Sequence, residues 1–313
     1  MRTATRAGQR SALTLATLIL VAACSTGESA AFTPEHAWLG DGSAPIAISH
    51  EGVAHSSGRI TQQGFIEARE IGFTYMETDI RRLADDTLVA YHDIDGNVEN
   101  QTLDQLNAVG DDAFDAEDPD FDTKVDGSDA ETKLLPPVPE VEALLAAPEL
   151  ADVRWNFELK GGDQKTAALL GAAMITAGAT ERVCVSFGVA VRVQSMRDAL
   201  PEGTCMCATI LERAFDWDAL AGSLDRVGID ERVVCSQMAS EPFRGSTLLQ
   251  VDRRDVRRAH DRFLAIHVYD VLGLETSRAD IERWLDMGVD GIITDDHHVL
   301  AEVFRERGIW PSD

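Results

Sequence analysis

Hydrophobic residues alternate between two patterns from about residue 45 to the C-terminal end of the chain. Short apolar runs, typical of buried parallel strands, are separated by stretches in which apolar residues recur every three to four positions, as in amphipathic helices. The expected strands are Pro45–His50, Tyr75–Arg81, Leu88–His92, Val153–Lys160, Arg182–Phe187, Thr204–Ile210, Arg232–Gln237, Phe263–Tyr269 and Gly291–Thr294. The expected helices are Thr61–Ile71, Lys165–Ala177, Val189–Leu200, Asp252–Arg262, Ser277–Met287 and His298–Arg307. This alternation predicts an α/β fold with parallel strands, and eight such units predict a (β/α)8 TIM barrel over residues 45–313.

The N-terminal segment has the pattern of an export signal. Three arginines, Arg2, Arg6 and Arg10, precede the apolar run 11–23, whose thirteen residues are too few to span a bilayer. The run ends in Val-Ala-Ala-Cys24, which resembles the lipobox of bacterial lipoproteins. We therefore expect a signal peptide at residues 1–23, a lipidated Cys24 and a flexible tether at 24–44. The protein would be exported and held by its lipid on the outer face of the cytoplasmic membrane. The alternative is an ordinary signal peptide and a secreted protein.

Charge excludes one class of partner. The chain has 54 acidic and 28 basic residues and a formal net charge of −26. A nucleic-acid binder needs a basic face to replace the counterions of phosphates, so nucleic acid is not expected as a partner. No protein partner is indicated either. The segment 111–131 contains ten of the acidic residues and few apolar ones, which predicts a solvated acidic loop inserted at about residues 95–135.

Four cysteines follow the signal segment: Cys184, Cys205, Cys207 and Cys235. Cys205 and Cys207 stand two apart in an expected strand, so their side chains point to the same face and could pair with neighbouring strands but hardly with each other. No Cys-x-x-Cys pair or His-rich segment accompanies them, and a zinc site is not expected. Buried unpaired thiols and inter-strand disulfides both remain open.

Ionisable residues gather where the expected strands end. In a parallel barrel these carboxyl ends form the face that carries active sites. Glu77 and Asp79 stand two apart, on one face of a strand, and Glu158 and Lys160 repeat this spacing on another. Histidines end two further runs, at His50 and His92. One strand-end histidine would indicate little, but several ionisable groups in this order indicate a catalytic site.

These residues resemble the motifs of the glycerophosphodiester phosphodiesterase family. The resemblance covers about residues 45–304, and its motifs are His50-Glu51-Gly52, Glu77-Thr78-Asp79-Ile80, Asp85-Asp86-Thr87, His92-Asp93, Pro137-Val138-Pro139-Glu140-Val141, Glu158-Leu159-Lys160, Ser186-Phe187 and Gly288-Val289-Asp290-Gly291-Ile292-Ile293-Thr294-Asp295. It implies a TIM barrel, in agreement with the strand–helix alternation. It also implies a small-molecule phosphodiester substrate, hydrolysed to glycerol 3-phosphate and an alcohol.

The resemblance also implies roles for the site residues. Glu77, Asp79 and Glu158 would bind one divalent cation, and three carboxylates suit Ca²⁺ or Mg²⁺ better than zinc. His50 would act as the general base and His92 as the general acid. Lys160 would add a positive charge beside the phosphate.

Two positions depart from the family pattern. Glu51 stands where the family has an arginine, while Arg59 falls on a position where the family has a glutamate. This exchange of charge suggests that the two side chains interact and that Arg59 binds the phosphate beside Glu51. His267 occupies the place of a family tryptophan and could be a third polar group for the substrate, although an ordinary role in the barrel wall is the favoured alternative.

Three other functions compete with this interpretation. Cleavage of lysophospholipids or sphingomyelin in the manner of phospholipase D uses a similar barrel and histidine pair. A degenerate barrel that only binds a ligand is suggested by Glu51. A glycosidase would use paired carboxylates, but it would leave His50 and His92 without a role.

Overall fold

The computed structural model describes residues 36–53, 60–92, 98–109, 137–160, 163–188, 193–210, 233–239, 251–269 and 276–310. All of them belong to one compact unit. The predicted signal peptide, Cys24, Arg59 and the acidic segment 111–131 lie outside the described residues.

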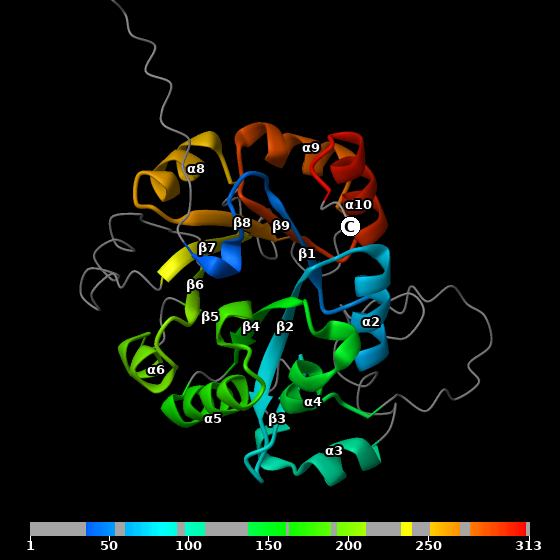
Figure 1. Ribbon diagram of the computed structural model, residues 1–313, viewed down its shortest axis with the longest axis vertical. Coiled ribbons are helices and arrows are strands. Elements are labelled where there is room, and N and C mark those ends of the chain that lie inside the picture. The colour runs from blue at the N-terminus through cyan, green and yellow to red at the C-terminus, as the bar shows by residue number, and fades with distance from the viewer. Residues whose placement is uncertain are drawn as a thin grey trace, which may run out of the picture. The chain divides into compact units, whose positions relative to one another are not determined.

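Eight parallel strands form a closed barrel. Their order in the barrel is β1 (Ile46–His50), β9 (Gly291–Thr294), β8 (Ala265–Tyr269), β7 (Val233–Ala239), β6 (Cys205–Ile210), β5 (Val183–Gly188), β4 (Arg154–Leu159) and β2 (Tyr75–Arg82). Pairing of β1 with β2 closes the ring, with Ile48 beside Tyr75 and His50 beside Glu77. Helices lie around the strands (Figure 1). The expected TIM barrel is confirmed.

The strand β3 (Leu88–Ala90) differs from the expectation, because it is antiparallel to β2 and is not one of the parallel barrel strands. The turn between the two strands is too short for the crossover that parallel strands require. It is a tight turn, in which Asp85 accepts a hydrogen bond from the Thr87 amide and Asp86 adopts a left-handed conformation with φ 69°. The hairpin nevertheless places His92, which follows β3, close to the carboxylates of β2.

Several helices begin where the sequence supplies capping residues. The α-helices are α2 (Gln62–Ile71), α3 (Leu103–Val109), α4 (Val141–Ala146), α5 (Gln164–Thr176), α6 (Val193–Ala199), α8 (Arg253–His260), α9 (Arg278–Met287) and α10 (His297–Glu306). Short 3-10 helices are η1 (Ala37–Leu39), η2 (Val98–Asn100), η4 (Pro148–Leu150) and η5 (Thr180–Arg182). Three residues expected to begin helices are instead N-caps: Thr61, Asp252 and Ser277. Their side chains accept hydrogen bonds from backbone amides of the first helical turn. Each of these three helices therefore begins one residue later than expected, whereas α5 and α10 begin one residue earlier.

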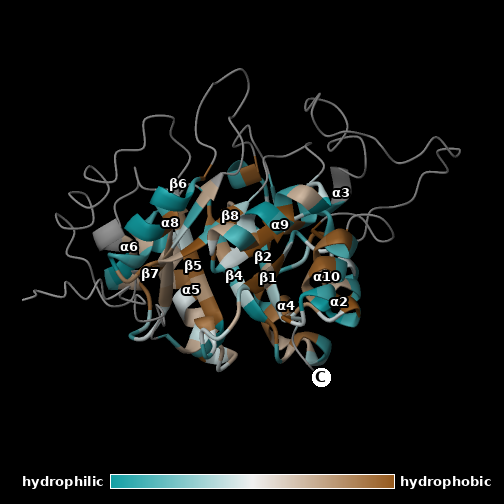
Figure 2. Ribbon diagram, turned by 90° about the horizontal axis from the view of Figure 1, so that it is seen from above, coloured by the Kyte–Doolittle hydropathy of each residue, from teal (hydrophilic) through white to brown (hydrophobic). Residues whose placement is uncertain are grey.

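The largest hydrophobic core lies between the strands and the surrounding helices. Phe65 of α2 packs edge-on against Trp155 of β4, with 5.1 Å between ring centroids, and both are buried. Figure 2 shows largely hydrophobic strands enclosed by helices of mixed hydropathy. None of the helices in the described part of the chain combines the length and hydrophobicity needed to cross a bilayer.

Trp38 of η1 closes the N-terminal end of the barrel, which we call the barrel floor. Its side chain is fully buried, and its indole N–H donates to the Trp155 carbonyl oxygen at 2.9 Å. Its ring meets Tyr75, at the start of β2, edge-on at 5.3 Å. The opposite end, formed by the carboxyl ends of the strands, carries the ionisable residues.

The four cysteines form two disulfides between neighbouring strands. Cys184 of β5 is bonded to Cys205 of β6, and Cys207 of β6 is bonded to Cys235 of β7. In each pair the two residues are register partners in the sheet. The alternative of unpaired thiols is therefore wrong, and the expectation that Cys205 and Cys207 do not pair with each other is correct.

Candidate active site

Three carboxylates converge at the carboxyl ends of β2 and β4. Side chains two residues apart share a face, so Glu77 and Asp79 both point into the barrel. The register places Asp79 of β2 beside Glu158 of β4. One oxygen from each of Glu77, Asp79 and Glu158 lies within 4.8 Å of the others. The alternation of side chains along β2 and β4, together with the register between these strands, thus brings together the three carboxylates that the sequence predicted as a group.

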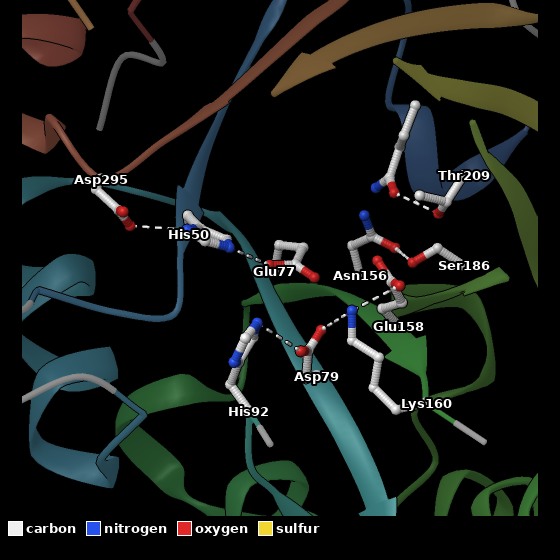
Figure 3. Close-up of polar contacts among 11 residues, drawn as sticks. His50, Glu77, Asp79, His92, Asn156, Glu158, Lys160, Ser186, Thr209 and Asp295 are labelled. Atoms are coloured by element: carbon white, nitrogen blue, oxygen red, sulfur yellow. Dashed lines mark hydrogen bonds and ion pairs between the residues drawn. The ribbon is translucent and has the colours of Figure 1, made fainter. Parts of the chain in front are cut away.

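The two histidines lie beside Glu77 and Asp79, on the side of the carboxylates away from Glu158 and Lys160 (Figure 3). His50 ends β1, and its Nε2 lies 3.5 Å from Glu77 Oε2. His92 follows β3, and its Nε2 lies 3.7 Å from Asp79 Oδ2. The imidazoles therefore face the carboxylate group from different structural units, a barrel strand and a hairpin.

Asp295 orients His50 from the other side of the ring. Its Oδ1 accepts a hydrogen bond from His50 Nδ1 at 2.7 Å, which leaves Nε2 facing the site. Asp295 follows β9, which pairs with β1 through Ser49 and Thr294. Asp295 stands in one of the sequence motifs, but its role could not be predicted, because the contact with His50 spans 245 residues and depends on closure of the barrel.

Lys160 and Tyr269 complete this side of the site. Lys160 Nζ lies 2.7 Å from Glu158 Oε1 and 3.2 Å from Asp79 Oδ1. Burial disfavours its charge, but the two carboxylates outweigh burial and raise the pKa of Lys160. Tyr269, at the carboxyl end of β8, is close enough that Glu158 raises its pKa further above the value set by burial. Position at the end of a strand was the signal that could have singled out Tyr269.

The turn after β1 brings Glu51 into the same group. Glu51 is buried and has a left-handed backbone with φ 53°. Its amide donates to the Glu77 carbonyl oxygen at 2.9 Å, and its carboxylate lies within 4.8 Å of ligand atoms of Asp79 and His92. The partner expected for it, Arg59, is outside the described residues, so the proposed exchange stays a prediction.

The carboxylates are difficult to ionise together. Burial is the main cause that raises the pKa of Glu77 well above its usual value, and Asp79 and Glu158 add to it against the opposing effect of His50. Burial likewise raises the pKa of Asp79 to about 7, against the opposing charge of Lys160. Burial disfavours protonated His50, but the charges of Asp295 and Glu51 outweigh burial and raise its pKa. The site thus carries an excess of negative charge that a cation would relieve.

These carboxylates fit a divalent cation. Glu77 Oε2 and Asp79 Oδ2 are buried and accept no hydrogen bond from the described residues. Buried carboxylate oxygens normally have a partner, and hard oxygen ligands suit Ca²⁺ and Mg²⁺. The residues present therefore match the cation that the family resemblance implies, without distinguishing between the two ions.

Two polar pairs line the barrel on the side away from the histidines. Ser186 donates to Asn156 Oδ1 at 2.9 Å, and Thr209 donates to Gln237 Oε1 at 2.9 Å. All four side chains are buried. Figure 3 shows Asn156, Ser186 and Thr209 on the Glu158 side of the carboxylates. These pairs were not predictable from the sequence, because they depend on the register between neighbouring strands.

His267 does not join this site. It is fully buried, and its ring lies 5.8 Å from that of Trp38 at the barrel floor. Burial lowers the pKa of His267 to about 4. The substrate-binding role considered for it is therefore corrected: the strand continues for two residues, and Tyr269 takes the position near the carboxylates.

A family model provides the deciding comparison. The model of the glycerophosphoryl diester phosphodiesterase family matches residues 50–299, which is most of the chain. The chain belongs to this family. It is therefore a phosphodiesterase, and its substrate is a small-molecule phosphodiester. The matched residues begin at His50 and include all three carboxylates and His92.

Individual relatives agree with this assignment. The phosphodiesterase is 28% identical over 296 residues to the probable glycerophosphodiester phosphodiesterase 2 of Mycobacterium tuberculosis, covering 87% of this chain and 99% of the relative. A glycerophosphodiester phosphodiesterase from Parabacteroides distasonis has a similar fold, with TM-score 0.62, 20% identity and coverage of 84% and 98%. A phosphodiesterase from Oleispira antarctica, solved with sn-glycerol-3-phosphate, has TM-score 0.61, 14% identity and coverage of 84% and 97%. These structural similarities support the barrel fold.

Proposed function

We propose that the protein hydrolyses glycerophosphodiesters to glycerol 3-phosphate and an alcohol, with one divalent cation, Ca²⁺ or Mg²⁺. The observation that carries the proposal is the placement of two imidazoles against one carboxylate group, with His50 Nε2 3.5 Å from Glu77 and His92 Nε2 3.7 Å from Asp79. A phosphodiester needs a proton removed from the attacking oxygen and a proton supplied to the leaving oxygen. Two histidines beside a phosphate site can supply both.

Glu77, Asp79 and Glu158 would hold the cation. Without it, these side chains and Glu51 would repel the anionic phosphate, and Lys160 alone would not balance them. When bound, the cation offsets the charge on the non-bridging phosphate oxygens. Lys160 then provides a further positive charge beside them.

The hydrogen bond to Asp295 supports His50 as the base. With Nδ1 donating to the carboxylate, His50 Nε2 carries the lone pair and can accept a proton from the attacking hydroxyl. The attacking group is water or the 2-hydroxyl of the substrate's own glycerol. His92, beside Asp79, would protonate the departing alkoxide.

The named relatives support the substrate class. The Mycobacterium tuberculosis relative is named as a glycerophosphodiester phosphodiesterase, and the Oleispira antarctica structure contains sn-glycerol-3-phosphate, the product proposed here. The polar pairs Asn156–Ser186 and Thr209–Gln237 offer hydroxyl and amide groups to a glycerol moiety.

The direct test is release of glycerol 3-phosphate from glycerophosphocholine with Ca²⁺, Mg²⁺ or EDTA. We expect release with at least one of the two ions and loss of release in EDTA. Lysophosphatidylcholine serves as the parallel substrate for cleavage in the manner of phospholipase D. If neither substrate is cleaved with either ion, the proposed substrate class is wrong.

We propose further that the phosphodiesterase is exported and anchored by a lipid on Cys24. The support is the arginine-flanked apolar run 11–23 that ends at this cysteine. Cys24→Ser should leave the precursor unprocessed or move the protein from the membrane fraction to the medium. Unchanged membrane association of the variant would place the anchor elsewhere.

A further inference from the structure

Helix α8 presents a stripe of arginines to solvent. The four residues form two adjacent i, i+4 pairs, so their side chains cover one side of the helix. The opposite side, with Val256 and Ala259, is buried. We call the exposed stripe the arginine face, and it consists of Arg253, Arg254, Arg257 and Arg258. The catalytic site uses none of them.

The stability of α8 does not account for this concentration of positive charge. The like-charged pairs Arg253–Arg257 and Arg254–Arg258 each destabilise a helix slightly. The helix dipole favours Arg257 and Arg258 in the last turn, but it disfavours the two arginines of the first turn. Basic residues are also scarce in this chain, with 28 against 54 acidic ones. A role outside the helix is therefore indicated.

Nearby carboxylates offset only part of the charge. Arg254 is paired with Asp252 at 2.9 Å. The carboxylate of Asp255 is engaged in the capping box, where it accepts the Asp252 amide. Within the part of the chain that the structure describes, neither Arg257 nor Arg258 makes an ion pair. The guanidinium groups of the last turn are thus available to an anionic partner.

Phe263 is the second, independent observation. It follows α8, and its side chain is 82% exposed. The amides of Phe263 and Leu264 donate to the carbonyl oxygens of His260 and Ala259, which is the helix ending that usually has glycine at the position of Phe263. The backbone there is left-handed, with φ 59°, and this is unfavourable for a bulky side chain. Neither the backbone nor the core explains a phenylalanine at this position.

Phe263 and the arginine face lie toward the barrel floor. Phe263 stands two residues before β8, whose start at Ala265 belongs to this end of the barrel. Arg253 donates to the carbonyl oxygen of Asp286 at 3.1 Å, near the end of α9 and before the start of β9. Figure 1 shows α8 outside the barrel strands. The arginine face is therefore remote from the catalytic carboxylates at the opposite end.

We propose that the arginine face and Phe263 dock on the surface of a membrane that contains anionic phospholipids. Guanidinium groups bind phosphate oxygens, and each arginine near an anionic surface strengthens the attachment. An exposed aromatic ring beside them can enter the boundary between headgroups and acyl chains. The same surface repels the acidic remainder of the protein, which confines the contact to α8 and Phe263.

The choice of a membrane rests on the lipid anchor proposed at Cys24, which would hold the barrel beside one. His36, from which the chain leads back to Cys24, lies 3.2 Å from the carbonyl oxygen of Gly203, just before β6 and at the same end of the barrel. Nucleic acid is disfavoured by the acidic charge of the whole chain. An acidic protein and a second copy of this chain are the remaining alternatives.

Vesicle binding by protein without its leader tests the proposal independently of the lipid anchor. The compact unit to which all described residues belong begins at Thr33, so residues 33–313 retain the barrel and lack Cys24. Binding is measured by cosedimentation with vesicles of phosphatidylcholine, alone or mixed with phosphatidylglycerol. We expect binding only to the mixed vesicles, and weaker binding as salt increases, because salt screens the attraction. The Cys24→Ser variant of the full chain tests the anchor separately.

A double variant, Arg257→Gln with Arg258→Gln, tests the arginine face. Loss of both charges should weaken binding to the mixed vesicles ~25-fold, at roughly 5-fold for each arginine. The matched control is Arg278→Gln with Arg283→Gln on α9, which changes the net charge equally at guanidinium groups that are already paired with carboxylates. The control should bind these vesicles as the parent does.

Phe263→Gly separates docking from folding. Glycine suits the left-handed backbone, so Tm should rise, while loss of the ring should weaken vesicle binding several-fold. A purely structural role for Phe263 would leave vesicle binding unchanged. Ile175→Ala is the control, at the other large hydrophobic side chain that is exposed among the described residues, and it should bind vesicles as the parent does.

Three results would each overturn the proposal: absent binding of the parent to the mixed vesicles, equal binding to phosphatidylcholine alone, or unchanged binding in both the double variant and Phe263→Gly. Analytical ultracentrifugation of the parent and the double variant addresses self-association. A dimer that the double variant abolishes, without binding of the parent to vesicles, would assign the arginine face to a second copy of the chain.

Discussion

His50 contacts a carboxylate through each of its ring nitrogens, and this arrangement makes Asp295 testable as a positioning residue. Asp295→Asn keeps the size of the side chain but removes the charge that fixes the tautomer of the ring. We expect kcat to fall roughly 10²-fold or more, as for loss of aligned acid–base catalysis. Because Asp295 raises the pKa of His50, its loss should also move the acidic limb of the kcat/KM profile to lower pH.

The matched control is Asp286→Asn, which alters an exposed ion pair with Arg307 far from the histidine in sequence. Its pH profile should equal that of the parent. An Asp295→Asn enzyme with a lower rate but an unshifted acidic limb would contradict the link between Asp295 and the proton on His50.

The two histidines should respond differently to the leaving group. His50→Ala and His92→Ala should each lower turnover of glycerophosphocholine by roughly 10²-fold or more. A nitrophenyl leaving group hardly needs a proton, so His92→Ala should recover much of its rate on that substrate while His50→Ala should not. Comparison of kcat for each variant on both substrates is the measurement, and equal losses on both would remove the assignment of base and acid.

Glu51 lies beside the carboxylate group, so the predicted exchange of charge between Glu51 and Arg59 should affect phosphate binding directly. Arg59→Glu should raise KM, because another carboxylate near Asp79 repels the phosphate. Glu51→Arg should also be harmful, while the double variant should recover activity beyond the sum of the single effects. A double-mutant cycle on kcat/KM measures the coupling, expected at about 0.5–3 kcal/mol for contacting residues. Additive effects would show that the two side chains do not interact.

At the scale of elements, the turn that carries His50 depends on a close approach of two backbones. Gly52 has φ +76°, and a Cβ there would lie 2.9 Å from the carbonyl carbon of Gly64 in α2. Gly52→Ala should therefore cost more than the roughly 1–2 kcal/mol of a left-handed alanine, and it should lower activity by displacing His50. Urea unfolding compares it with Gly178→Ala, which has φ +61° and open space. Equal losses of stability would show that α2 does not constrain the turn.

Helices and strands were predictable because a local pattern of residues decides each of them. Contacts between distant elements were not predictable in this way. Apolar runs located all nine strands of the described residues, and capping residues such as Thr61 marked helix starts to within one residue. The direction of β3 was mistaken for that of a barrel strand because the hydrophobic pattern of a strand contains no information about its partner. His267 was considered for the substrate because it stands in place of a family tryptophan, but its depth in the barrel depends on where β8 ends.

At the scale of the whole molecule, the acidic site should make the metal-free protein less stable as pH rises. The folded pKa of Asp79 is about 7, above its unfolded value near 3.8, so the folded state retains a proton that the unfolded state has lost. The free energy of unfolding in EDTA should therefore fall between about pH 4 and 7, by an amount on the order of 1–3 kcal/mol. Chemical denaturation across this range is the measurement.

Asp79→Asn provides the comparison for the pH series, since it keeps the shape of the side chain without a proton to lose. Its stability should vary less between pH 4 and 7, and it should exceed that of the parent at pH 7. A saturating divalent cation should also flatten the parent's profile, by stabilising the folded state in proportion to RT ln(1 + [L]/Kd). A parent that becomes more stable toward pH 7 in EDTA would contradict the assigned pKa of Asp79.

The barrel floor has a consequence for orientation at a surface. The described chain begins at His36, beside Trp38 on the barrel floor. The catalytic histidines and carboxylates lie at the other, open end of the barrel. Eleven residues lie between Cys24 and His36, which allows a tether of at most about 40 Å when extended. A protein tethered by Cys24 would thus be attached through the closed end of its barrel. Attachment at this end leaves the open end accessible to diffusing, water-soluble diesters.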